Sequence, residues 1–159
     1  MVHLKARENL KLEDAAEIWK KLRDLLTPDH GLLLDMYVEN TSAEDWRQFL
    51  HFLHAGSYRT EYRYGEDWQS VPHGPEELFQ RREQTHLIRI DLGDLWLHCH
   101  CFDLEEIELD LDPAEVNNAG QAGKLVRFLA ELANAVKKDV ILTPESFKEG
   151  AFLVMHADR

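Results

Sequence analysis

The sequence predicts one α+β domain, built as a mainly antiparallel sheet with a central β-meander and three to four flanking helices. Three β-patterned runs follow one another between residues 87 and 111 with only short connections, which is typical of a meander. Before and after them, apolar residues recur at three- and four-residue steps, which predicts helices. Because 159 residues contain no linker-like stretch, we expect a single domain over residues 1–159.

The first third of the chain predicts a helix, a strand and a second helix. Helical periodicity runs from Leu12 to Leu26 and stops at Thr27-Pro28; the expected buried stripe is Leu12, Ala15, Ala16, Trp19, Leu22 and Leu26. Alternation over residues 32–39 then predicts a half-buried strand. The next helix is expected to begin at Thr41 or Ser42, because each places a hydroxyl three residues before a carboxylate, as a capping box requires.

The middle of the chain predicts four strands. Tyr58 to Tyr64 alternates, and its face Tyr58, Tyr62 and Tyr64, with nearby Trp68, offers residue types that favour interfaces, although aromatics at this spacing are more often core. A loop over residues 72–75 and a short helix over 76–82 follow. The meander then consists of residues 87–92, 95–102 and 105–111, with Gly93-Asp94 as the tight turn of its hairpin.

The last third predicts one long helix and two short strands. Asp112-Pro113 is typical of a helix start, and the stable part is expected over residues 122–136. Residues 140–142 and 151–156 are β-patterned. The segment Thr143 to Glu145 is compatible with a further helical turn, which leaves two alternatives open there.

The charge balance restricts the partners that this chain is expected to bind. Thirty acidic and eighteen basic side chains give a formal charge of −12, which opposes nucleic acid and anionic lipid surfaces. The charge therefore serves solubility alone or a basic protein partner. No apolar run approaches the length of a membrane span, and no secretory signal is present, so we expect a cytoplasmic protein with Cys99 and Cys101 as reduced thiols.

The run His98-Cys99-His100-Cys101 contains four potential metal ligands. Side chains alternate along a strand, so His98 and His100 share one face while the two cysteines share the other. The histidines make a zinc site only if a neighbouring strand supplies another ligand, for which His86 and Asp91 are the candidates. The other interpretation is that the cysteines belong to an apolar core face and that no metal is bound.

The densest charge feature is an acidic row that follows the second strand of the meander. Alternation points Ile107, Leu109 and Leu111 inward and the acidic residues outward into solvent, so the candidate partner-binding residues are Glu106, Glu108, Asp110 and Asp112. One interpretation is a solvated sheet face, and the other is a docking surface for a cationic partner. A catalytic pair of carboxylates is disfavoured because no apolar pocket is visible to raise one pKa.

Enzyme signatures are otherwise absent, since the chain lacks a nucleophile elbow, a phosphate-binding glycine loop and a zinc-protease helix. We therefore expect neither catalysis nor a cofactor.

The order of segments is similar to that of small bacterial immunity proteins that accompany secreted or contact-delivered toxins. The resemblance covers TSAEDWRQFLHFL, YRTEYRYGEDWQSVPHGPEELF, LWLHCHCFDLEEIELDLDPAEV and KLVRFLAELANAVKKDVILTPES, about residues 41–146. It implies a cytosolic, non-catalytic and acidic protein that covers the active surface of a toxin. The expected function is thus a protein-binding domain that neutralises a toxin; the alternative is a metal-binding protein or enzyme centred on His98 and His100.

Overall fold

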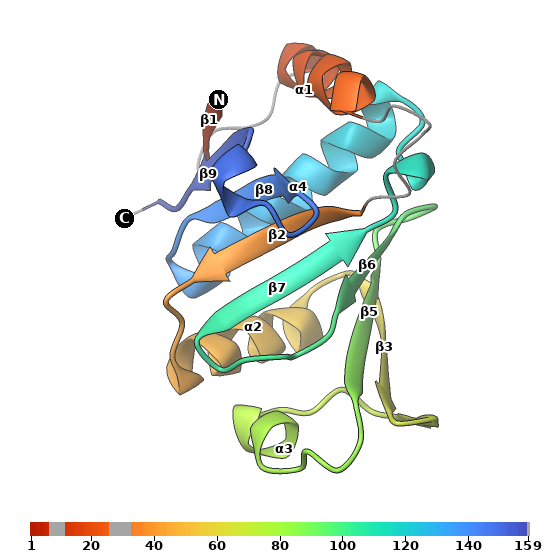
Figure 1. The fold of residues 1–159 in the computed structure, drawn as a ribbon, viewed down its shortest axis with the longest axis vertical. Helices are drawn as coiled ribbons and strands as arrows, with labels where there is room; N and C mark the ends of the chain where they lie inside the picture. Colours follow the sequence, from red (N-terminus) through yellow and green to blue (C-terminus); the bar gives the residue numbers. More distant parts are fainter. Residues whose placement is uncertain (7–11, 26–32, 159) are drawn as a thin grey trace.

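The computed structural model describes residues 1–6, 12–25 and 33–158, and it confirms the α+β class. In these residues nine strands form one sheet in the order β1-β9-β8-β2-β7-β6-β5-β3-β4 (Figure 1). All neighbouring strands are antiparallel except the pair β1 and β9. The strands are β1 (Val2–Lys5), β2 (Leu34–Glu39), β3 (Arg59–Tyr64), β4 (Asp67–Gln69), β5 (His86–Asp91), β6 (Trp96–Cys99), β7 (Glu106–Leu111), β8 (Val140–Pro144) and β9 (Leu153–His156).

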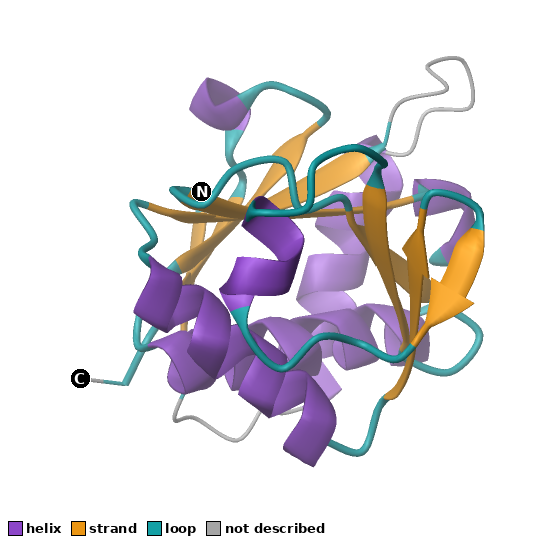
Figure 2. Cartoon of the chain, turned by 90° about the horizontal axis from the view of Figure 1, so that it is seen from below, coloured by secondary structure: helices purple, strands orange, loops and turns teal. Residues whose placement is uncertain are grey.

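Four α-helices occur in the described residues: α1 (Leu12–Leu25), α2 (Ala43–Ala55), α3 (Pro75–Phe79) and α4 (Ala119–Val136). Figure 2 shows the helices gathered on one side of a sheet that bends around them. The opposite face, here called the open face, carries no long helix in the described part of the chain. The 3-10 turn η2 (Lys148–Gly150) lies against part of it, because Lys148 reaches the Tyr37 ring. The fold is therefore two-layered, with one sheet face left for other contacts.

The core lies between the helices and the sheet. Its centre is α4, whose Leu125, Phe128, Leu129 and Leu132 are fully buried. The inward residues of the meander, Ile107, Leu109 and Leu111, are fully buried as the alternation predicts. Burial of such apolar side chains supplies the main favourable term in folding.

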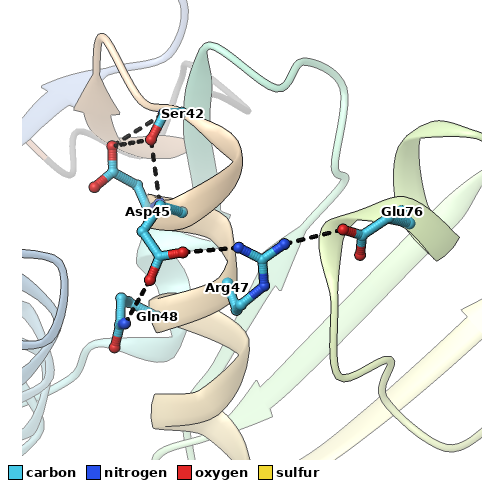
Figure 3. A network of polar contacts seen from close by, with 6 residues as sticks. Ser42, Asp45, Arg47, Gln48 and Glu76 are labelled. Atoms are coloured by element: carbon cyan, nitrogen blue, oxygen red, sulfur yellow. Dashed lines mark hydrogen bonds and ion pairs between the residues drawn. The ribbon is translucent and has the colours of Figure 1, made fainter.

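Helix α2 begins with the predicted capping box. Ser42 Oγ accepts a hydrogen bond from Asp45 N, and the Asp45 carboxylate accepts one from Ser42 N, so two helix-end amides are satisfied (Figure 3). The same helix is tied to α3, since Arg47 lies between Glu44 and Glu76 at 2.7 and 2.9 Å. These contacts stabilise the first turn of α2 and tie the helix to α3.

The hairpin between β5 and β6 also forms as predicted. Gly93 and Asp94 both have positive φ, +87° and +59°, which a two-residue turn of this kind requires. The Asp91 carboxylate accepts the amide N–H of Gly93 at 2.7 Å and holds the turn.

Several local expectations were wrong. Strands β1 and β4 were not predicted, because four and three residues are too short to show a pattern. In α1, Ile18 is buried while Ala16 is exposed, so the buried stripe is rotated from the expected one. The side chains of Leu12 and Leu22, and residues 26–32 with the expected helix stop and strand start, lie outside the described residues.

Two boundaries also differ from the expected ones. Asp112 caps the 3-10 turn η1 (Pro113–Glu115), whereas α4 is capped by Asn118, whose side chain accepts from Gln121 N. Strand β6 ends at Cys99, because Cys101 has a φ of +55° that leaves the extended conformation. The segment after Thr143 continues β8 to Pro144 and turns at η2.

Candidate functional site

The acidic row predicted on β7 meets a second set of polar residues on β2. The register places Asp35 opposite Asp110, Tyr37 opposite Glu108 and Glu39 opposite Glu106. We call the five carboxylates the acidic cluster: Asp35, Glu39, Glu106, Glu108 and Asp110. The contribution of β2 was not predicted, although the alternation in that strand sets Asp35, Tyr37 and Glu39 apart from its apolar face.

The four predicted partner-binding residues are not equally exposed. Glu106 and Glu108 are partly exposed on the open face, and Asp112 is exposed beyond the end of β7. Asp110, in contrast, keeps only 8% of its surface exposed. The expectation of a row standing fully in solvent was therefore wrong at Asp110, because strands on both sides of β7 bring neighbouring side chains over it.

Tyr37 links the carboxylates across the two strands. Its hydroxyl lies 2.9 Å from Asp35 Oδ2 and 3.4 Å from Glu108 Oε1. Burial, followed by the hydrogen bond to Asp35, raises the pKa of Tyr37 well above its ordinary value, so the phenol keeps its proton and acts as a donor. Asp35 Oδ2 also accepts the amide N–H of Ser146 at 2.7 Å, which holds the start of the η2 segment on this face.

Within the described residues, Lys148 is the one lysine or arginine that forms an ion pair with the acidic cluster. Its ammonium lies 2.7 Å from Glu106 Oε1, 3.9 Å from Glu39 Oε2 and 4.6 Å from the centre of the Tyr37 ring. The hydrogen bond to Glu106 is the main reason that the pKa of Lys148 is raised. One positive charge therefore offsets part of the charge of the cluster.

The remaining negative charge of the acidic cluster affects the pKa of Glu108. Partial burial raises the pKa of this carboxyl, and repulsion from Asp35, Glu106 and Asp110 raises it further. The hydrogen bond from Tyr37 opposes this rise. Burial and the like-charge environment therefore both disfavour the ionised form of Glu108.

Both histidines of the candidate metal site lie on the open face next to Asp110. His100 Nε2 donates to Asp110 Oδ2 at 2.8 Å, and this hydrogen bond is the main cause of the raised pKa of His100. His98 Nδ1 lies 3.7 Å from Asp110 Oδ1, but burial lowers the pKa of His98. Sequence reasoning did not find Asp110 as the acid that contacts both rings.

The expected third ligand His86 lies on the other face of the sheet. It is buried against Tyr62, whose hydroxyl is 2.6 Å from His86 Nδ1, and its Nε2 donates to the Arg81 carbonyl. The second candidate, Asp91, holds the hairpin turn instead. Across the described ranges, no three His, Cys, Asp or Glu side chains are grouped so that they could hold a metal ion.

The two cysteines lie on the core face, as the apolar interpretation expects. Both are buried, and their sulfur atoms are 4.0 Å apart. The side-chain hydrogen bond with Cys99, followed by burial, raises the pKa of Cys101, which disfavours the reactive thiolate form of this residue.

The tyrosines of β3 belong to the core side, whereas its arginines reach the open face. Tyr62 is 1% exposed, which excludes it as an interface anchor of the folded chain. On the open face the Trp96 ring lies between Arg89 and Arg59, at 4.3 and 5.8 Å from its centre. Glu61 lies 3.9 Å from Arg59 and 3.2 Å from Arg89, so this part of the face combines an aromatic ring with paired charges, while the β2–β7 part is acidic.

Two shallow hollows adjoin the acidic cluster, and Tyr37 lines both. The first, of about 310 Å³, is bounded by Tyr37, Glu106, Glu108, Ser146, Lys148 and Glu149. The second, of about 490 Å³, is bounded by Tyr37, Glu39, Asn40, Lys137, Lys138, Asp139, Ile141 and Val154. Both hollows are open to solvent, and charged side chains form much of their walls.

Comparison with known proteins found no match: no protein-family model matches the sequence, and neither a curated protein nor a solved structure matches it significantly. The resemblance to immunity proteins therefore stays a prediction. None of the helices in the described residues is both long and apolar enough to cross a membrane.

Proposed function

We propose that this chain is a non-enzymatic protein-binding domain and, more specifically, a bacterial immunity protein that neutralises a toxin with a basic surface. The observation that carries the proposal is the acidic cluster. Its carboxylates come from adjacent strands on a sheet face that no long helix of the described residues covers. Burial raises the pKa of Glu108 and repulsion from its acidic neighbours raises it further; a cationic partner would relieve the repulsion.

The cluster is costly for the free protein. Asp35 lies directly opposite Asp110, and like charges in such positions destabilise a sheet, whereas Lys148 contacts both Glu39 and Glu106 and offsets part of their charge. Departures of this kind from local stability rules are expected at functional sites. In this proposal Glu106, Glu108 and Asp112 contact the partner, whereas Asp110 positions the histidines from its buried place beside them.

The test uses the protein encoded by the neighbouring gene as the candidate toxin. We expect the purified pair to form a complex that weakens with ionic strength, because clustered charge contributes mainly to steering and orientation. The double variant Glu108→Lys and Glu149→Lys changes the first hollow and should weaken the complex at least about tenfold, which corresponds to about 1.4 kcal/mol. It should also abolish protection of cells against the toxin.

A matched control changes the net charge by the same amount elsewhere. Glu17→Lys with Asp24→Lys lies on exposed positions of α1, on the helical side of the sheet. This control should bind like the unmodified chain. Equal weakening by both variants would show a general charge effect, and unchanged binding by the first would remove the acidic cluster as the docking surface. Failure to form a complex and to protect cells would contradict the immunity function itself.

A further inference from the structure

A histidine pair joins the two parallel strands at one edge of the sheet. His3 on β1 and His156 on β9 both lie on the open face, and His3 Nδ1 is 2.8 Å from His156 Nε2. The planes of the two rings are nearly parallel, with an angle of 8° between them. The pair is separate from the acidic cluster and plays no part in the function proposed above.

A carboxylate sets the orientation of the inner ring. Asp139 Oδ2 lies 3.1 Å from His156 Nδ1, and because a carboxylate only accepts, that nitrogen carries the proton. The other oxygen of Asp139 accepts the amide N–H of Ala157 at 3.0 Å, which restrains the carboxylate. In the neutral ring, the lone pair of His156 Nε2 therefore points towards His3.

This arrangement matches the surroundings of a metal-bound histidine, in which the ring nitrogen not bound to metal donates to a carboxylate. We propose that His3 and His156 form a zinc-type divalent metal site, with Asp139 as the positioning residue, that fastens β1 onto β9. The site has two protein ligands, and water completes the coordination because the His3 ring is exposed. The negative charge of the whole chain favours accumulation of cations near it.

Metal binding requires a rotation of the exposed ring. The two nitrogens face each other head-on, with 2.8 Å between them and 5.1 Å between the ring centres, whereas two nitrogens bound to one tetrahedral zinc ion lie about 3.3 Å apart with their lone pairs converging on the ion. The exposed His3 side chain can rotate to provide this movement. In the neutral pair the bridging proton moves from His3 Nδ1 to His3 Nε2, which leaves two lone pairs for the ion and releases no net proton.

The test measures Zn²⁺ binding to the full chain, purified without a histidine tag and treated with chelator, by titration calorimetry at pH 7.5. One equivalent should bind, and saturating Zn²⁺ should raise the thermal midpoint, because a ligand that binds only the folded state stabilises it. His3→Gln and His156→Gln should each abolish both effects. Asp139→Asn should weaken binding about tenfold, as loss of an outer hydrogen-bond partner does.

His51→Gln provides the control, since it removes an exposed histidine on α2. This variant should bind Zn²⁺ and respond in its thermal midpoint like the unmodified chain. Circular dichroism without metal checks that each variant is folded. Absence of binding would show that the pair is a hydrogen bond alone, and binding retained by both His3→Gln and His156→Gln would place the ion elsewhere; either result overturns the proposal.

Discussion

Glu108→Gln is expected to stabilise the folded protein at neutral pH, although it removes a charge from the proposed binding surface. Burial raises the pKa of Glu108, and repulsion from Asp35, Glu106 and Asp110 raises it further. Tyr37 donates only a long hydrogen bond of 3.4 Å to this carboxylate. Glutamine keeps the size of the side chain and an acceptor oxygen. The substitution therefore removes repulsion with little loss of contact.

The size of the effect follows from the position of the side chain. Charged cross-strand pairs are worth about 0.2–1 kcal/mol. Glu108 lies directly opposite Tyr37, so its acidic neighbours are diagonal or two positions away on the same strand, and with its partial exposure we expect an effect of about 0.5 kcal/mol. For a domain of this size such a change raises the thermal midpoint by about 1–2 °C. Urea unfolding followed by tryptophan fluorescence gives the free energy directly.

The pH dependence distinguishes charge from packing. A carboxyl whose pKa is higher in the folded state destabilises that state above this pKa, and the cost disappears as pH falls towards the ordinary value of 4.5. The advantage of Glu108→Gln should thus be full at pH 8 and vanish near pH 4.5. Glu66→Gln, at an exposed loop position, should show no such trend. An advantage that is absent at pH 8, or equal at both pH values, would refute the electrostatic explanation.

Two further predictions concern residues whose contacts are local. Ser42→Ala should lower the free energy of unfolding by about 1 kcal/mol, because α2 loses the hydrogen bond that the Ser42 side chain accepts from Asp45 N. Urea unfolding measures this loss, and an unchanged midpoint would show that the Ser42 side chain does not stabilise the helix. Asp110→Asn should lower the pKa of His100, because the hydrogen bond to the Asp110 carboxylate is the main cause that raises it. NMR titration of the His100 ring measures the shift. An unchanged pKa would show that Asp110 does not control the protonation of this ring.

The elements that were predicted well carry their signal in short sequence windows. Ser42 with Asp45 predicts the start of α2, and Gly93-Asp94 predicts the hairpin turn, because capping and turn formation depend on residues only one to three positions apart. The expected start of α4 was wrong for the same kind of reason. Asp112-Pro113 has the residue types of a helix start, but in the structure Asp112 caps the 3-10 turn η1, and α4 begins only after Asn118.

The candidate site was predicted only in part. The alternation of β7 correctly separated Glu106 and Glu108 from its buried apolar residues. It did not predict that Lys148 and Ser146 approach the same face, because nothing in the sequence around them indicates which strand they will lie against. Contacts over more than a hundred positions, such as that of Ser146 with Asp35, depend on the path of the whole chain.

By itself, the sequence determined that this is an acidic α+β chain with a meander, and which side of each meander strand is apolar, since charge and two-residue periodicity are properties of neighbouring residues. Only the tertiary structure decided that β2 lies between β7 and β8. That pairing placed Asp35 against Asp110 and buried an acid that alternation alone would leave in water. Strand order is set by how the whole sheet packs on its helices, so it is a global outcome that no short window of residues contains.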